Sequence, residues 1–297
     1  MAIAENQLVT WANLPSSKQH RDTYASIRGV LLDSNSPYAS RSKDVYLQGS
    51  YGNDTNVYGD SDVDIVICSD ASFDHDLTNL PQAQADAFKR DHPGTGLTVG
   101  SLKDDVYNWL RRHYGNDVQP PKKVVHINEQ PHRRKADVLP CIEHRRYRHY
   151  NSLADNSYYL GVQFYAADGT KIVNFPKEHS KDCTAKHGYT SDRFKPTVRI
   201  FKNMRHAMIN KRIINDGLAP SYYIEGMLWN VPHDHYVGTH AATVPNCLNW
   251  LNKADKTKLL CAHQLRWLLR DGAPDSWPPG NFDQFLAATI KFWNAGG

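Results

Sequence analysis

The chain has 297 residues, of which 40% are hydrophobic and seven are tryptophan, enough to build the cores of two lobes. Its formal net charge of +4 mildly favours an anionic partner such as a nucleotide, without selecting one. The sequence has no run of about eighteen apolar residues, no secretory leader and no internal repeat, which argues against a membrane span, an exported protein or a repeat fold.

The cysteines indicate a reduced, cytoplasmic protein. They are widely spaced and form no C-x-x-C pair, so they predict neither a disulfide framework nor a strong zinc site. His179, Cys183 and His187 recur at intervals of four and could suggest zinc, but they supply only three ligands, and we expect no zinc there. The five cysteines are Cys68, Cys141, Cys183, Cys247 and Cys261.

The first elements lead to a turn suited to phosphate. Residues 17–32 predict an opening helix, and residues 44–48 alternate weakly, as a short strand does. Gly49 and Ser50 follow, and a Gly-Ser turn lets backbone N–H groups and a hydroxyl approach a triphosphate closely. Residues 51–61 are rich in Gly, Asn, Asp and Ser, which predicts a short hairpin-like connection.

Two aspartates on the next strand indicate a cation site. Side chains two apart on a strand share a face, so Asp62 and Asp64 should point together, while Val63, Ile65 and Ile67 point into a core. Two adjacent carboxylates repel one another unless they hold a cation. Oxygen ligands of this kind suit Mg²⁺ or Mn²⁺ rather than zinc or copper.

A long insertion, residues 69–119, comes next, and its second half predicts a helix. Ser101 with Asp104 resembles a capping-box start. The expected buried face consists of Leu102, Val106, Trp109 and Leu110.

A third aspartate lies in another predicted strand. Residues 122–128 form a short β-like run, and residues 135–139 form a second strand, which we expect to end at Pro140 and Cys141. Asp137 lies within it, with its two neighbours on the opposite face.

Basic residues surround Asp137, so it could equally be an ordinary salt-bridged acid. The same residues could create a positive field over a phosphate site or form a solvated rim. They are Arg133, Arg134, Lys135, Arg145, Arg146, Arg148 and His149.

Beyond this point the chain is expected to be mainly helical. Residues 161–175 first predict a strand pair that turns at Asp168 and Gly169. The later candidates for buried helical faces are Leu259, Leu260, Trp267, Leu268, Phe282, Phe285, Leu286 and Trp293.

Residues 191–209 predict a helix with a basic stripe. Ser191 or Asp192 can cap it, and Pro196 fits its first turn. The stripe could bind phosphate, pair with nearby acids or simply form a solvated face. Its members, at i, i+4, i+7 and i+11, are Lys195, Arg199, Lys202 and His206.

Ser221 is expected near the start of the next helix, which opens at residues 219–225. A helix N-terminus with a free hydroxyl can hold an anion, although Ser221 could be only an N-cap.

The joined Gly49-Ser50 and Asp62-x-Asp64 pattern resembles the polymerase-β-type nucleotidyltransferase superfamily. The fuller string from Gln48 to Asp64 resembles the bacterial CD-NTases, cyclic-oligonucleotide synthases of anti-phage signalling operons (CBASS) and relatives of cyclic GMP-AMP synthase and oligoadenylate synthase. The resemblance continues downstream and covers most of the chain.

The resemblance implies an α+β fold. A polymerase-β-like nucleotidyltransferase lobe with a mixed sheet, residues 1–170, would include the spine helix and pack on an α-helical lobe, residues 171–297. The active site would lie in the cleft between them.

The resemblance also implies a two-metal site for Mg²⁺ or Mn²⁺. Asp62, Asp64 and Asp137 would be the catalytic residues and metal ligands, with Asp137 the candidate base. The nucleoside triphosphate would contact Gln48, Gly49, Ser50, Lys202 and Ser221.

The implied function is a Mg-dependent nucleotidyltransferase (EC 2.7.7.-) that makes a cyclic di- or trinucleotide from triphosphates, with ATP or GTP expected, without a nucleic-acid template. Alternatives are an enzyme that adds nucleotides to RNA or a small molecule, and a non-catalytic nucleotide or RNA sensor. A downstream effector would respond to the product. A conjugation partner could act through the C-terminal Gly297, although a frayed, flexible tail explains the same residues.

The bases, ring size and linkage stay open. The family places residues 182–194, including Thr190, close to the nucleobase. Tyr51, Tyr165 and Tyr189 are possible stacking partners or ordinary packing residues.

Overall fold

The computed structural model describes residues 2–15, 18–58, 62–93, 99–273 and 276–297. Their contacts divide the chain into two compact units. This division differs from the expected single boundary near residue 170, because two N-terminal segments associate with the C-terminal half. The sheet unit comprises Ser17–Gln48 and Ser61–Glu178, and the helical unit comprises Met1–Ser16, Gly49–Asp60 and His179–Gly297.

The sheet unit contains the mixed sheet that the sequence predicted. Its strand order is β1-β2-β4-β5-β6, and β3 pairs with β4. β2 and β4 are parallel, and the other pairs are antiparallel. The strands are β1 (Lys43–Leu47), β2 (Val63–Asp76), β3 (Val125–Ile127), β4 (Ala136–Ser152), β5 (Asp155–Tyr165) and β6 (Lys171–Asn174).

β4 is longer than expected, because it continues through Pro140 and Cys141 to Ser152. It pairs with β3 up to Val138 and with β5 from Ile142 onwards. Pro140 therefore falls where one side of the strand has no partner, and its missing N–H can be tolerated there. The prediction that Pro140 and Cys141 end the strand was wrong.

Helices cover the sheet on the side where Ile65 and Ile67 are buried. The predicted opening helix and the predicted insertion helix are confirmed, and both contribute to this core. The insertion helix begins at Val99, so Ser101 lies inside its first turn rather than at the cap. α4 was not predicted. The helices of this unit are α2 (Lys18–Leu31), α4 (Gln82–Asp91) and α5 (Val99–Tyr114).

The predicted strand pair near residue 168 is confirmed as the β5–β6 hairpin. Gly169 has a φ of +83°, which favours glycine, and the Asp168 carboxylate accepts a 2.9 Å hydrogen bond from the Thr170 amide.

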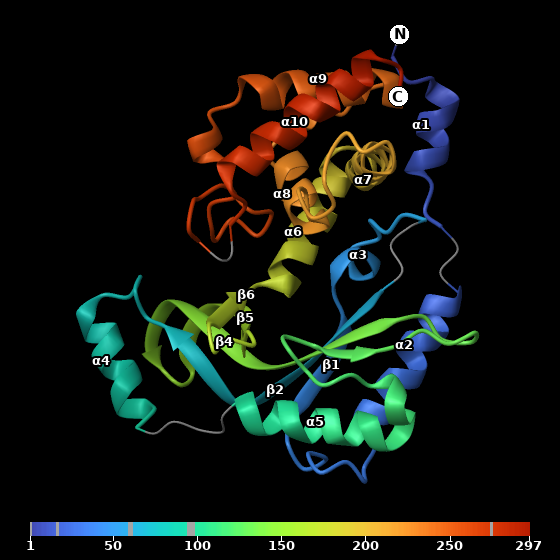
Figure 1. Ribbon diagram of the computed structural model, residues 1–297. Helices are drawn as coiled ribbons and strands as arrows, with labels where there is room; N and C mark the ends of the chain where they lie inside the picture. The colour runs from blue at the N-terminus through green and yellow to red at the C-terminus, as the bar shows by residue number, and fades with distance from the viewer. Residues whose placement is uncertain (1, 16–17, 59–61, 94–98, 274–275) are drawn as a thin grey trace. The chain divides into compact units, whose positions relative to one another are not determined.

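α7 forms the centre of the helical unit and packs against α1, α8, α9 and α10. Figure 1 shows α9 and α10 alongside one another, as their contacts also indicate. The helices are α1 (Glu5–Ala12), α3 (Gly49–Gly52), α6 (Pro176–Tyr189, which begins in the sheet unit), α7 (Phe194–Asn210), α8 (Ser221–Trp229), α9 (His240–Lys253) and α10 (Pro279–Asn294).

The start of α7 differs from the prediction. Ser191 and Asp192 have φ values of +49° and +63°, and they link α6 to α7 rather than cap α7. Instead, the Thr190 hydroxyl accepts a 3.0 Å hydrogen bond from the Phe194 amide. Pro196 lies in the first turn, as expected.

The predicted buried helical face is confirmed for α10, with Phe282 and Phe285 at 0% exposure. Leu259 and Leu268 are buried but lie outside the helices, so the helical prediction was wrong there. Leu260 forms an isolated β-bridge with Trp267, which is 44% exposed and has the Arg270 guanidinium over its ring. In the part of the chain that the structure describes, no helix has the length and apolar character needed to cross a bilayer.

Candidate functional site

Two of the three predicted carboxylates lie on adjacent strands of the sheet unit, and the third comes just before one of these strands. Asp64 on β2 is directly opposite Asp137 on β4 in the parallel register, and Asp62 comes immediately before β2. Val63 and Ala136, beside them in sequence, are fully buried in the core of the opposite face. The alternation of a strand therefore presents the acids on one face, as predicted.

Each outer carboxylate has a nitrogen donor beside it. Lys135 Nζ lies 2.8 Å from Asp62 Oδ2, and His126 Nδ1 lies 2.5 Å from Asp137 Oδ1. His126 on β3 is directly opposite Asp137, so His126, Asp137 and Asp64 form a row across three strands. Sequence reasoning missed His126. The signal was the alternation of Val125 and Ile127, which places His126 on the other face.

Most of the basic residues around Asp137 pair with acids outside the carboxylate set. Arg133 and Arg134 contact Asp117 at 2.7 Å and Glu129 at 3.0 Å, so neither is the partner of Asp137. Three pairs continue the pattern along β4 and its neighbours: Arg145–Glu143 at 2.7 Å, Arg146–Asp76 at 3.5 Å and His149–Asp155 at 3.2 Å. These acids offset much of the positive field.

The carboxylates offer the kind of donor atom that a hard divalent cation binds. Their donors are all oxygens, and Asp62 and Asp137 retain exposed fractions of 33% and 19% in their side chains. Oxygen-only ligands with solvent access are typical of Mg²⁺ and Mn²⁺ sites. The Lys135 ammonium already stabilises this negative charge from one side.

The Gly-Ser turn belongs to the helical unit and adopts a helical conformation. Gly49 has a φ of +64°, a conformation that favours glycine, and it opens the four-residue helix α3. The expected hairpin-like connection is therefore wrong over residues 51–58, and residues 59–61 lie outside the described part of the chain. The amides of Asn53 and Thr55 donate to the carbonyls of Gly49 and Ser50, at 3.1 and 2.9 Å.

Three of the four members of the basic stripe of α7 are buried rather than solvated, and His206 is half-buried. Lys195, Arg199 and Lys202 are 7%, 8% and 0% exposed. All three contact the segment after the Gly-Ser turn: Lys195 pairs with the Asp54 carboxylate at 3.2 Å, Arg199 donates to the Asp54 carbonyl at 2.5 Å, and Lys202 donates to the Thr55 carbonyl at 2.9 Å. Burial lowers the pKa of Arg199 to about 10.

Ser221 is the first residue of α8, and it does not act as a cap. Its hydroxyl lies 3.2 Å from Arg205 Nη1, which also donates to the Ala219 carbonyl. Arg205 Nη2 is 2.7 Å from His206 Nε2. The hydroxyl is thus placed beside a guanidinium, which suits an anion.

A buried polar cluster that the sequence did not reveal surrounds Glu225 on α8. Its carboxylate accepts hydrogen bonds from His179 Nε2 at 2.7 Å, Asn53 Nδ2 at 3.0 Å and Thr55 Oγ1 at 2.5 Å. The ligand atoms of His179, Cys183 and Glu225 all lie within 4.8 Å of one another. Three donors already occupy the carboxylate oxygens of Glu225, whereas His179 Nδ1 is buried without a hydrogen-bond partner among the described residues.

Each partner of the buried pair shifts the pKa of the other toward its charged form. Burial alone would lower the pKa of His179, but Cys183 and the Glu225 carboxylate more than offset this effect and raise it to about 10. Burial alone would raise the pKa of Glu225, whereas the hydrogen bond from His179 brings it below its usual range.

Stability is expected to depend on His179 between pH 6.5 and about 10. Because its pKa of about 10 lies above its ordinary value of 6.5, the stabilisation is complete below pH 6.5 and is lost as the pH rises through the folded value. The difference in Tm between the wild type and His179→Gln should therefore shrink over this range. For His187→Gln, in the same helix, the difference should stay constant, because burial lowers the pKa of His187. A constant difference for His179→Gln would contradict the ion pair.

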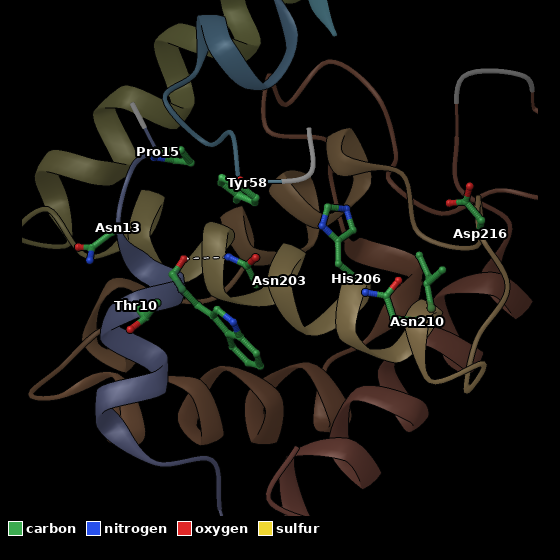
Figure 2. A pocket seen from close by; sticks show the side chains of 10 residues that line it. Thr10, Asn13, Pro15, Tyr58, Asn203, His206, Asn210 and Asp216 are labelled. Atoms are coloured by element: carbon green, nitrogen blue, oxygen red, sulfur yellow. Dashed lines mark hydrogen bonds between the residues drawn. The ribbon is translucent and has the colours of Figure 1, made fainter. Parts of the chain in front are cut away.

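A cavity of about 910 Å³ lies beside α1 and α7 in the helical unit (Figure 2). Trp11 and Tyr58 provide aromatic surface, and Asn203, whose amide donates to the Trp11 carbonyl at 3.0 Å, provides polar groups together with His206. The remaining lining residues are Thr10, Asn13, Pro15, Ile209, Asn210 and Asp216.

The residues expected near the nucleobase have varied surroundings. Thr190 is 2% exposed and its hydroxyl is engaged at the start of α7. Tyr189 is 72% exposed and stacks on His233 with 5.3 Å between ring centroids, and Tyr165 is 42% exposed.

Comparison with known proteins relates the whole chain to one group of enzymes. Residues 181–294 match the model of the cGAS/DncV-like nucleotidyltransferase C-terminal helical domain. The chain is 33% identical to a cyclic UMP-AMP synthase of Rhodothermus marinus over 100% of both chains. It is 32% identical to the cyclic nucleotide synthase CdnE01 of Staphylococcus haemolyticus over 99% of both.

Solved structures agree with this relationship. The R. marinus CdnE c-UMP-AMP synthase with Apcpp and Upnpp matches with a TM-score of 0.87, covering 99% of this chain and 98% of that one, at 33% identity. The Elizabethkingia meningoseptica CdnE cyclic dinucleotide synthase with GTP and Apcpp matches with a TM-score of 0.76 over 99% of both chains, at 28% identity.

Proposed function

Because this chain belongs to the bacterial CD-NTases, the cGAS/DncV-like nucleotidyltransferases, we propose that it joins nucleoside triphosphates into a cyclic di- or trinucleotide and releases pyrophosphate. The product would serve as a second messenger in anti-phage defence, where a separate effector responds to it. The observation that carries this proposal is the row formed by Asp64 and Asp137 on adjacent strands, with Asp62 beside it.

Asp62, Asp64 and Asp137 are the residues proposed to hold Mg²⁺ or Mn²⁺. Two such ions, when bound, would neutralise charge on the attacking and leaving oxygens of a phosphoryl transfer. Asp137 would accept the proton of the attacking ribose hydroxyl. Lys135 would orient Asp62 by the 2.8 Å contact that joins them.

We assign the triphosphate to the Gly-Ser turn and the start of α8. Gln48, Gly49 and Ser50 would approach it through backbone N–H groups and one hydroxyl. Ser221 would contact phosphate beside Arg205. The buried contact of Lys202 with the Thr55 carbonyl supports a role in holding this segment, and a direct phosphate contact of Lys202 stays a proposal.

ATP is the substrate that the comparisons favour. Two solved relatives, at 33% and 28% identity, both contain Apcpp, together with Upnpp in the first and GTP in the second. We therefore propose ATP together with a second triphosphate, either a pyrimidine or GTP.

A conjugation partner acting through Gly297 is a further proposal. In the structure the tail is bound: the Gly297 amide donates to the Phe292 carbonyl at 3.0 Å, and Lys211 Nζ donates to the Gly297 carbonyl at 2.8 Å. The expected frayed tail is therefore not what the described residues show, and conjugation would require these contacts to open.

Product analysis tests the proposed function. The protein is incubated with ATP, GTP, CTP and UTP and with Mg²⁺ or Mn²⁺, and phosphatase-resistant products are identified by mass spectrometry. We expect a cyclic nucleotide that a doubly substituted Asp62→Ala, Asp64→Ala protein does not make. Extension of an RNA primer without any cyclic product would instead favour the RNA-directed alternative.

A further inference from the structure

The segment after the Gly-Ser turn is buried although its side chains are polar. None of the four residues of α3 is buried, so this short helix has little apolar contact of its own. In contrast, Asn53, Thr55 and Asn56 are only 5%, 0% and 2% exposed. Hydrogen bonds replace water for the side chains of Asn53 and Thr55, so their partners determine the position of this segment, whereas Asn56 Nδ2 has no hydrogen-bond partner in the part of the chain that the structure describes.

Thr55 is held from both sides by the helical unit. Its hydroxyl donates to Glu225 Oε1 at 2.5 Å, and its carbonyl accepts from Lys202 Nζ at 2.9 Å. Its amide donates to the Ser50 carbonyl at 2.9 Å. A shift of Thr55 would therefore be transmitted directly to Ser50.

Glu225 connects this segment with the other proposed phosphate contact. Glu225 follows Ser221 by four residues on α8, so the two lie on the same face of the helix. One short helix thus carries the anchor of the Gly-Ser turn and the Ser221 hydroxyl. The pairing with His179 keeps the carboxylate ionised and leaves both oxygens as acceptors.

We propose that Glu225 is a positioning residue that, through Thr55 and Asn53, fixes the Gly49-Ser50 turn in the geometry that receives a nucleoside triphosphate. This inference rests on the proposed function, because it assigns the triphosphate to that turn. A metal site at His179, Cys183 and Glu225 explains this cluster less well. Three donors already occupy the carboxylate oxygens of Glu225, and the Lys202 ammonium lowers the pKa of the same carboxylate by its positive charge.

Thr55→Val tests the proposal with little change in shape. It removes the hydroxyl that Glu225 binds, and it leaves Glu225 paired with His179, so the fold is better preserved than in a Glu225 variant. Thr55→Ser restores the hydroxyl. The matched control is Thr243→Val on α9, because Thr243 is 1% exposed and donates a 2.9 Å hydrogen bond to the Val237 carbonyl, in the same unit.

Two quantities are measured for each protein: the Kd for Apcpp with Mg²⁺ by calorimetry, and pyrophosphate release from the four triphosphates. We expect Thr55→Val to weaken Apcpp binding by about 10- to 100-fold, because a misplaced turn loses oriented phosphate contacts. Thr55→Ser should recover most of this loss. The Kd of Thr243→Val should stay within about twofold of the wild-type value, even if its Tm falls as much as that of Thr55→Val. The reason is that the Thr243 hydrogen bond is independent of the Gly49-Ser50 turn.

The outcomes separate this proposal from the proposed function. An unchanged Kd in Thr55→Val, or an equal loss of Apcpp binding in Thr243→Val, would overturn the positioning role of Glu225. The proposed function would stand in that case, provided that the wild type releases pyrophosphate. A wild type that binds Apcpp but releases no pyrophosphate would overturn the proposed function, and the Kd series would still decide the role of Glu225. A wild type that neither binds Apcpp nor releases pyrophosphate from any of the four triphosphates would overturn both.

Discussion

Replacing Asp64 with asparagine is expected to reduce pyrophosphate release by at least about 10³-fold, because a lost metal ligand removes several kcal/mol of charge stabilisation in the transition state. Asp64 lies opposite Asp137 in the register, so the substitution would remove the carboxylate that neighbours Asp137 on the adjacent strand. The measurement is the initial rate with saturating triphosphates and Mg²⁺ or Mn²⁺.

The fold should survive this change. Removing one of several adjacent carboxylates relieves repulsion, so Tm without metal should stay equal or rise. The matched control is Asp70→Asn, an exposed aspartate on the same strand, which should keep the wild-type rate. Full activity in Asp64→Asn would remove this residue from the metal site, and an equal loss in Asp70→Asn would point to damage to β2.

Asp137→Asn is expected to reduce the rate by about 10²- to 10³-fold, through loss of both a metal ligand and a proton acceptor. The change keeps the size of the side chain and removes only its charge. The rate is measured over a range of Mn²⁺ concentrations, and the concentration that gives half the maximal rate should rise.

His126→Gln separates the two roles that the structure allows for Asp137. If Asp137 were only the hydrogen-bond partner of His126, both variants would lose the same activity, because the 2.5 Å contact is broken in each. If Asp137 is a metal ligand, His126→Gln should lose less than about tenfold, as expected for a residue that only orients the carboxylate.

The three predicted carboxylates were found because their positions follow from local rules. Strand alternation placed Asp62 and Asp64 on one face and Val63 in the core, and the same rule placed Asp137. The insertion helix was found through its apolar spacing, and the β5–β6 turn through Asp168 and Gly169. Each signal lies within a few residues, where the period of a strand or helix directly determines the direction of a side chain.

Some elements had weak local signals and were missed. α6 has almost no segregation of polar and apolar faces, and two of its three buried residues are His179 and Lys186 rather than aliphatic residues. α1 is only eight residues long. Periodicity cannot identify a helix whose buried positions are polar or whose length allows few repeats.

The sequence alone determined the family resemblance, the mixed sheet and the carboxylate pattern, because these depend on neighbours along the chain. Only the tertiary structure decided the role of the basic stripe and of Glu225. Glu225 meets Thr55 across 170 residues and Asn53 across 172. Whether a charged side chain faces water or a buried partner depends on which distant segment packs against it. The spacing of residues along the chain does not identify that segment.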